Sequence, residues 1–327
     1  MGGELGYERE RSEAITVARL AARLCQSVRK HMVDPGTLEK SDRSPVTVAD
    51  FGSQALICRH LIETFGDPIV GEEDATDLRK AEGTDLLASV QGYLRDAGLE
   101  GTSKEVCDWI DHGNGQVADR YWTLDPIDGT KGFLRNDQYA VALALIEEGD
   151  LKVAVLACPA LPVNDGVCLG TLMVAVRGQG TEMMPLEADT GESVVVDTSG
   201  NEASHRFVES VESGHGNQTL QAKIATAVDI HSPSLRMDSQ AKYAAVARGD
   251  AVLYLRLPSP GSGRYAEKIW DHAAGALVVE EAGGTVTDMH GEPLDFASSE
   301  RLHSNEGVVV SNGTIHNNVI DALKRLA

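Results

Sequence analysis

The sequence has few cysteines, and their placement excludes two kinds of small-domain scaffold. Its 327 residues contain five of them: Cys25, Cys58, Cys107, Cys158 and Cys168. They are odd in number and none belongs to a Cys-x-x-Cys pair, which argues against a disulfide framework and against a structural zinc site. We therefore expect a reducing compartment and predict a cytoplasmic protein.

Basic residues are scarce beside acidic ones. The chain has 29 lysines and arginines against 50 aspartates and glutamates, a formal net charge of −21. So acidic a surface repels both a nucleic-acid backbone and an anionic membrane, and we expect neither as a partner. A small phosphate ester can still bind where divalent cations reverse the local potential at a group of carboxylates.

Long hydrophobic runs are also missing. The apolar run over residues 139–146 is too short to span a bilayer, and charges at Glu4, Glu8 and Arg9 stand where a signal peptide needs an apolar core. We therefore expect no membrane span and no secretion signal. No internal repeat or low-complexity tract is visible, and the length suits one or two domains.

Hydrophobic periodicity and turn residues predict a mixed α/β chain. Helices are expected over residues 9–32, 50–65, 85–96, 242–246 and 269–281, and strands over 68–71, 121–124, 139–146, 151–157, 167–176 and 251–257. Asp50 would then lie in the first turn of its helix. Residues 75–119 are interpreted as a surface segment that carries no identifiable chemistry. A boundary near 200–206 would divide an N-terminal α+β domain, residues 1–205, from a C-terminal α/β domain, residues 206–327.

Acidic residues follow two of the predicted strands directly. Glu72 comes after residues 68–71, while Asp125 and Asp128 come after residues 121–124. Carboxylates crowded at strand ends cannot all stay ionised unless cations neutralise them. Magnesium prefers such oxygen ligands, and two ions roughly 3.5–4 Å apart can activate a water and stabilise a leaving oxygen. Phosphate-ester hydrolysis is the reaction that this arrangement serves.

Taken alone, Asp-Pro-x-Asp-Gly-Thr equally suits a tight turn with a capping aspartate. Three motifs in order carry more weight, and together they resemble the metal-site signature of the inositol monophosphatase superfamily. They are Gly71-Glu72-Glu73, Asp125-Pro126-Ile127-Asp128-Gly129-Thr130 and Trp270-Asp271. The resemblance covers most of the chain. It implies a layered αβαβα sandwich and a magnesium-dependent, lithium-sensitive phosphatase.

Four longer strings resemble the bisphosphate nucleotidase branch of that superfamily more specifically. They are Ser-Pro-Val-Thr at 44–47, Lys-Gly-Phe-Leu-Arg at 131–135, Asp-Ser-Gln-Ala-Lys-Tyr at 238–243 and Glu-Lys-Ile-Trp-Asp-His at 267–272. The branch implies hydrolysis of the 3′-phosphate of adenosine 3′,5′-bisphosphate, and of its sulfated form, within sulfur metabolism. A small phosphorylated nucleotide is then the expected partner, and we expect a monomer.

The resemblance also implies ligands for two to three magnesium ions. Glu72, Asp125 and the carbonyl of Ile127 would hold one ion, and Asp125, Asp128 and Asp271 would hold a second. Asp125 would bridge the two ions, and Glu72 would help to hold a third, weaker one.

The attacking water is assigned by the same resemblance to Asp50 and Thr130, which would orient and deprotonate it. A hydroxyl between a carboxylate and a water can relay a proton, as general-base catalysis requires. Hydrolysis would be in-line, without a covalent phosphoenzyme. A helix cap for Asp50 and a turn hydroxyl for Thr130 are the structural alternatives.

Substrate contacts implied by the resemblance are Gly129, Thr130, His215, Ser239, Lys242, Arg256 and Asp271. Lys242 and Arg256 supply the positive charge that a second phosphate needs. The plainer alternatives are a solvated helix lysine and a strand-edge arginine. The residues after His215, Gly-Asn-Gln-Thr, depart from the Ser-Ser-His-Asp continuation of the family.

Two other functions stay open at this stage. An inositol polyphosphate 1-phosphatase, or a broad inositol phosphatase, shares every metal ligand, although Lys242, Arg256 and residues 267–272 favour the nucleotide. A non-catalytic sensor of the bisphosphate nucleotide would be marked by a lost metal ligand or water activator, and none is lost here.

Overall fold

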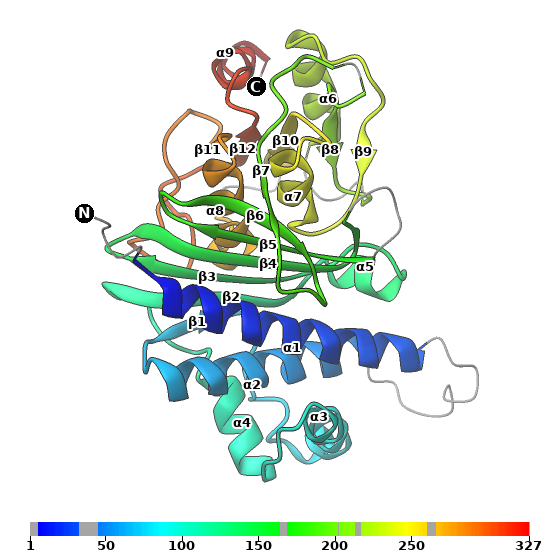
Figure 1. Cartoon of the computed structure of the whole chain (residues 1–327), viewed down its shortest axis with the longest axis vertical. Helices are drawn as coiled ribbons and strands as arrows, with labels where there is room; N and C mark the ends of the chain where they lie inside the picture. Colours follow the sequence, from blue (N-terminus) through cyan, green and yellow to red (C-terminus); the bar gives the residue numbers. More distant parts are fainter. Residues whose placement is uncertain are drawn as a thin grey trace.

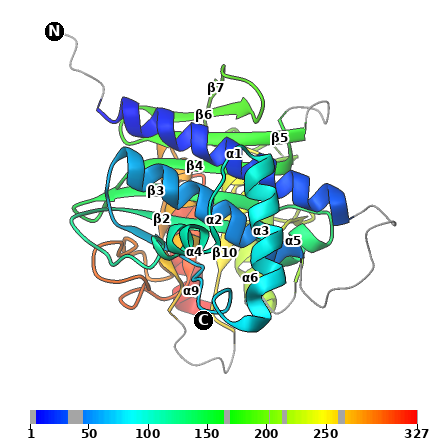
Figure 2. The same ribbon diagram turned by 90° about the horizontal axis from the view of Figure 1, so that it is seen from below.

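The first layer of the protein is a pair of helices, α1 (Glu8–Met32) and α2 (Pro45–Thr64), which pack together across one face of a sheet (Figure 2). The buried face of α1 is rich in alanine, and small side chains allow close packing. Outside α2 lie η1 (Ala81–Gly83), α3 (Thr84–Asp96) and α4 (Ser103–Asp111). This computed structural model describes residues 6–32, 45–163, 169–201, 203–212, 217–259 and 266–326.

The second layer is a seven-stranded sheet in which the strands follow one another in chain order. Its strands are β1 (Ile69–Gly71), β2 (Arg120–Asp128), β3 (Ala140–Glu147), β4 (Asp150–Pro162), β5 (Leu169–Val176), β6 (Gly180–Pro185) and β7 (Glu192–Val194). The β1–β2 pair is parallel and every later pair is antiparallel. Both faces are covered by helices (Figure 1), so the central strands are apolar throughout.

Three further layers complete the stack. Helices α7 (Ala241–Ala247) and α8 (Ala273–Glu281), with the short η2 (Ile269–Asp271), lie between the two sheets. The second sheet runs in the order β11 (Thr285–Thr287), β12 (Val308–Ser311), β10 (Leu253–Arg256), β8 (Phe207–Glu209) and β9 (Leu235–Arg236). Helices α6 (Gln218–Ala227) and α9 (His316–Leu326) cover its far side (Figure 1). The αβαβα sandwich is confirmed.

Three clusters of buried hydrophobic residues lie between these layers and hold them together. One lies between α1, α2 and the large sheet, the second between that sheet and α7 and α8, and the third between the small sheet, α6 and α9. The second cluster draws on both halves of the chain, for example Tyr121 and Leu277. The boundary predicted near 200–206 falls between β7 and β8, and two separate domains stay a prediction.

The helix predicted over 50–65 begins earlier than expected. Pro45 is the first residue of α2, a position where proline is favoured because its missing N–H is not needed there. Asp50 is therefore in the second turn, and both the first-turn placement and the helix-cap alternative for it are wrong. Ser44, which precedes this helix, lies outside the described residues, as do Cys168 and His215.

Other expectations need smaller corrections. The predicted strand 121–124 continues to Asp128, with a bulge between Asp125 and Asp128 in place of a turn that ends the strand. The surface segment over 75–119 contains α4, which begins with a capping box between Thr102 and Glu105. The predicted helix 269–281 is divided at His272 into η2 and α8.

The structure describes four of the five cysteines. Cys25, Cys58, Cys107 and Cys158 are free and buried. Over the described ranges, no helix is both long and apolar enough to cross a bilayer.

Candidate active site

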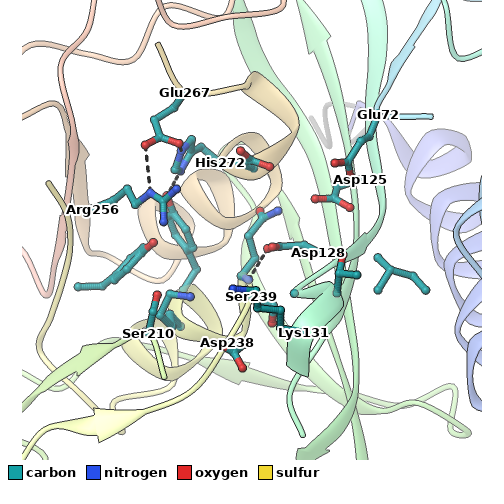
Figure 3. Close-up of a pocket in the computed structure, with 18 residues that line it drawn as sticks. Glu72, Asp125, Asp128, Lys131, Ser210, Asp238, Ser239, Arg256, Glu267 and His272 are labelled. Atoms are coloured by element: carbon teal, nitrogen blue, oxygen red, sulfur yellow. Dashed lines mark hydrogen bonds and ion pairs between the residues drawn. The ribbon is translucent and has the colours of Figure 1, made fainter. Parts of the chain in front are cut away.

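A pocket of about 320 Å³ lies where the end of β2 meets α5 (Thr130–Leu134), α7, β10 and η2 (Figure 3). Its walls include every predicted site residue except Asp50 and His215. His215 is outside the described residues. Asp50 is buried beside the pocket and does not line it, and no hydrogen bond joins it to Thr130 within the described part of the chain. The other predicted residues are brought together as expected.

The strand register places the first two acidic residues side by side. Gly71 pairs with Leu124 in the parallel β1–β2 ladder, so Glu72 and Asp125 follow at neighbouring positions. Gln54 on α2 holds this strand end, because its side-chain oxygen accepts a hydrogen bond from the Glu73 N–H at 3.1 Å. Ser53 on the same helix donates to the Pro126 carbonyl at 3.3 Å. Helix α2 thus fixes both acidic segments.

Gln240 connects the remaining two acidic residues. Its backbone N–H donates to an Asp128 carboxylate oxygen at 2.5 Å, and its side-chain amide donates to the Trp270 carbonyl at 2.9 Å. Its side-chain oxygen accepts from the Gly275 N–H at 3.0 Å. Because Gln240 is almost fully buried, this network sets the position of Asp128 relative to the segment that carries Asp271.

Helix α5 begins at the predicted hydroxyl, Thr130, after a glycine with a left-handed backbone. Gly129 has φ of 89°, and a Cβ there would lie 2.8 Å from the Cβ of Ser239. A larger residue would meet both the backbone strain and this clash. Arg135, at the other end of α5, pairs with the carboxylates of Asp238 and Glu212. The loop that presents Thr130 is therefore tied to the C-terminal half.

Glu72, Asp125, Asp128 and Asp271 form an acidic wall of the pocket, and these carboxylates lie close enough together to shift the pKa values of one another. Burial raises the pKa of Asp125 well above its usual value, and the carboxylates of Glu72, Asp128 and Asp271 raise it further. Burial and Glu73 raise the pKa of Glu72 to about 7. Burial, with Asp128 and Glu72, likewise raises the pKa of Asp271 to about 7. Neutralising cations would relieve this repulsion.

The residues present fit a hard divalent cation. The predicted donors are carboxylates and one carbonyl, the oxygen set that magnesium prefers. One oxygen of Asp125 is buried and has no hydrogen-bond partner in the described structure. Among the described residues, the one group of such side chains whose ligand atoms all lie within 4.8 Å of one another is Glu267, Asp271 and His272, which shares only Asp271 with the predicted set.

Lys242 and Arg256 bring positive charge to the same pocket and form its cationic wall. Lys242 is 5% exposed, and burial lowers its pKa to about 8 although Asp128 opposes the change. Its ammonium lies 5.2 Å from the centre of the Tyr254 ring. Arg256 pairs through Nε with Glu267 at 3.0 Å. Lys242 is therefore not the solvated helix lysine of the plainer alternative. Arg256 ends β10 and its side chain is 27% exposed.

Several pocket residues carried no predicted role. They are Lys131, Ser210, Asp238, Gln240, Tyr243, Tyr254, Glu267 and His272. Tyr254 could have been found, because residues two apart on a strand share a face and Arg256 was already a candidate. The position of Ser210 depends on long-range pairing of β8, for which the sequence has no local signal.

The raised pKa values predict how stability depends on pH without metal. Glu72 and Asp271 keep protons up to pH of about 7, whereas unfolded carboxyls release them near pH 4. The folded state therefore binds more protons over this window, and the free energy of unfolding falls as pH rises through it.

We expect the melting temperature in a chelator to fall between about pH 5 and about pH 8, and magnesium to restore it at pH 8. Differential scanning fluorimetry with and without magnesium measures both effects. A metal-free melting temperature that rises over this range would contradict the crowding of these carboxyls.

Comparison with known proteins agrees with this arrangement. The family model described as "Inositol monophosphatase family" matches residues 8–326. A protein of Emericella nidulans named 3′(2′),5′-bisphosphate nucleotidase is 41% identical, over 98% of this chain and 99% of its own length. A protein of Oryza sativa with the same name is 40% identical, over 97% of this chain and 94% of its own.

Solved structures show the same fold at lower identity. An inositol monophosphatase from Anabaena (Nostoc) superposes with a TM-score of 0.63 at 20% identity, covering 98% of this chain and 97% of that one. CysQ from Bacteroides thetaiotaomicron, described as a bacterial member of the inositol monophosphatase family, gives 0.63 at 22% identity, covering 95% and 99%. From the match of its sequence along almost its whole length, the chain belongs to the inositol monophosphatase family.

Proposed function

We propose that this chain is a cytoplasmic 3′(2′),5′-bisphosphate nucleotidase that hydrolyses the 3′-phosphate of adenosine 3′,5′-bisphosphate, giving AMP and phosphate. The observation that carries the proposal is a single pocket with an acidic wall, including Asp125, and a cationic wall formed by Lys242 and Arg256. A substrate with two phosphates can engage both walls at once. The names of the relatives at about 40% identity support this choice.

The cationic wall favours the nucleotide over an inositol monophosphate. With one phosphate at the acidic wall, a second phosphate needs its own positive partner, and an arginine or lysine in the pocket meets that need with strong, charge-assisted hydrogen bonds. At neutral pH Lys242 is mainly protonated, because its pKa of about 8 stays above neutrality. A substrate without the second phosphate would leave the terminal nitrogens of Arg256 without a phosphate to bind.

Magnesium is the cofactor that we propose, in two to three ions. Glu72, Asp125 and the Ile127 carbonyl would hold the first, and Asp125, Asp128 and Asp271 the second, with Glu72 assisting a third. When bound, magnesium supplies the positive charge that activates a water and stabilises the leaving oxygen. Gln240 would keep Asp128 in place while that charge is bound.

The residues of the chain would then perform the proton transfer. Thr130 would accept the proton of the attacking water at its hydroxyl oxygen and pass its own hydroxyl proton to Asp50. Helices α2 and α5, which carry these two residues, pack against each other, and this contact supports the pairing. Gly129 and Ser239 would line the phosphate, and the ester oxygen would leave in line with the attacking water.

Three further parts of the proposal concern the protein as a whole. We propose that it also accepts the sulfated form of the nucleotide, and thus acts in sulfur metabolism. We propose that it works as a monomer. The N-terminal domain, residues 1–205, would carry most metal ligands, and the C-terminal domain, residues 206–327, the nucleotide contacts and Asp271.

A phosphate-release panel tests the proposal. The substrates are adenosine 3′,5′-bisphosphate, its sulfated form, inositol 1-phosphate and an inositol bisphosphate, each with magnesium and with a chelator. We expect the highest kcat/KM with the bisphosphate nucleotide and no release in the chelator. Preference for either inositol substrate would replace the nucleotide assignment with the inositol one.

Lithium is expected to inhibit the reaction. A small monovalent cation can occupy a magnesium position, yet it lacks the charge that stabilises the leaving oxygen. Phosphate release at subsaturating magnesium should fall in tens of millimolar lithium and stay unchanged in the same concentration of potassium. Equal rates in the two salts would count against the proposed metal mechanism.

A further inference from the structure

Arg256 is held in the pocket by one carboxylate. Its Nε donates to Glu267 at 3.0 Å, and no other hydrogen bond or ion pair engages its side chain within the described part of the chain. The pairing uses the inner nitrogen of the guanidinium and leaves its two terminal nitrogens for a ligand. A guanidinium can bind a phosphate through two such parallel N–H groups.

Glu267 is itself backed by buried groups. Its second oxygen is buried without a hydrogen-bond partner, and Nε2 of His272 lies 3.7 Å from it. The other ring nitrogen of His272 is 2.7 Å from the Tyr243 hydroxyl. His272 and Tyr243 are almost fully buried, and Figure 3 shows Glu267 beside both Arg256 and His272 at the edge of the pocket.

The Glu267 carboxylate lies between two nitrogen-bearing side chains, Arg256 and His272. The Arg256 guanidinium lies 3.0 Å from one of its oxygens and the His272 ring lies 3.7 Å from the other. An ionised carboxylate beside an arginine fixes the direction of a long side chain that otherwise has many rotamers. Without it, the guanidinium of Arg256 could turn toward other anions of the pocket, such as Asp271.

We propose that Glu267 is a positioning residue for substrate choice: it orients Arg256 so that the terminal nitrogens face the second phosphate of the substrate. The inference rests on the proposed function, because it needs a substrate with two phosphates. In this account Glu267 does not touch the substrate, and its effect passes entirely through Arg256. The matched substrates are adenosine 3′,5′-bisphosphate and adenosine 3′-monophosphate, which differ only in the 5′-phosphate.

Steady-state kinetics of Glu267→Ala, Glu267→Gln, Arg256→Ala and the double alanine variant test this role. We expect Glu267→Ala to lower kcat/KM for the bisphosphate about tenfold, mainly through KM, and to change the monophosphate less than about twofold. Glu267→Gln should stay within about threefold of wild type, because its amide oxygen still accepts from Arg256 Nε. The double variant should be no worse than Arg256→Ala.

A matched control and a second variant keep the test decisive. Glu300→Ala removes an exposed ion pair with Lys268 outside the pocket and should change neither substrate. If circular dichroism shows Glu267→Ala unfolded, Glu267→Asp retains the charge but withdraws it from Arg256, and should show the same selective loss.

Equal losses on the two substrates, or additive losses in the double variant, would overturn the positioning role while leaving the nucleotidase proposal intact. A wild-type protein that releases no phosphate from the bisphosphate would overturn the proposed function itself.

Discussion

Asp125→Asn and Asp128→Asn are expected to lower phosphate release at least about 10²- to 10³-fold, because each removes a charge from the site that stabilises the developing charge of the reaction. Circular dichroism should show both variants folded. Turnover and magnesium binding should be measured together, by phosphate release and calorimetry. Near wild-type activity in either variant would show that the assignment of the metal ligands is wrong.

Asp125→Asn should also stabilise the protein when metal is absent. Burial and three neighbouring carboxylates make the Asp125 charge unfavourable in the metal-free fold, and one of its oxygens lacks a partner. An uncharged amide removes that repulsion. We expect a higher melting temperature than wild type in a chelator, and a smaller increase when magnesium is added. An equal increase with magnesium in the variant and in wild type would argue that Asp125 does not hold the ion.

Thr130→Ala is expected to lower kcat by about 10²- to 10⁴-fold, the range for loss of a positioned proton-transfer group. Thr130→Ser retains the hydroxyl and should recover most of the activity, which separates proton transfer from packing. Asp50→Asn should lose activity to a similar extent, because the two residues would act as one relay. If Thr130→Ala keeps more than about a tenth of wild-type kcat, the hydroxyl is not part of the relay.

The acidic wall could be predicted from the sequence because its causes are local. Glu72 follows the short strand β1, and Asp125 lies within β2 directly after its apolar residues 121–124, so the parallel pairing of the two strands places both acids at one edge. The position of Asp50 in its helix was predicted wrongly. The sequence pattern suggested a helix that begins at Asp50, whereas α2 begins at Pro45. A proline at a helix start is a signal that could have corrected this.

The cationic wall could be predicted only in part. Lys242 and Arg256 were identified by resemblance, but their burial and their partners depend on contacts between distant segments. Glu267 meets Arg256 across 11 residues of chain, and the sequence alone does not show that its carboxylate faces the guanidinium. Gln240 belongs to the motif Asp-Ser-Gln-Ala-Lys-Tyr at 238–243, but its three hydrogen bonds depend on the packing of α7 against α8, which the motif does not show.

The fold was predictable to a similar degree. The central strands β3, β4 and β5 are long, apolar and separated by turn residues, which is the strongest strand signal. The edge strand β7 has only three residues, mostly exposed, and pairing with β6 rather than its own sequence makes it a strand. Helix α4 was missed although Thr102 and Glu105 form a capping box that the sequence displays.

The identity of the phosphate that leaves tests the central claim most directly. Phosphorus NMR of adenosine 3′,5′-bisphosphate incubated with the protein and magnesium distinguishes the two possible monophosphate products. The account predicts adenosine 5′-monophosphate and inorganic phosphate in equal amounts, formed with magnesium and not in a chelator. Formation of adenosine 3′-monophosphate, an unchanged substrate, or the same rate in the chelator would contradict it.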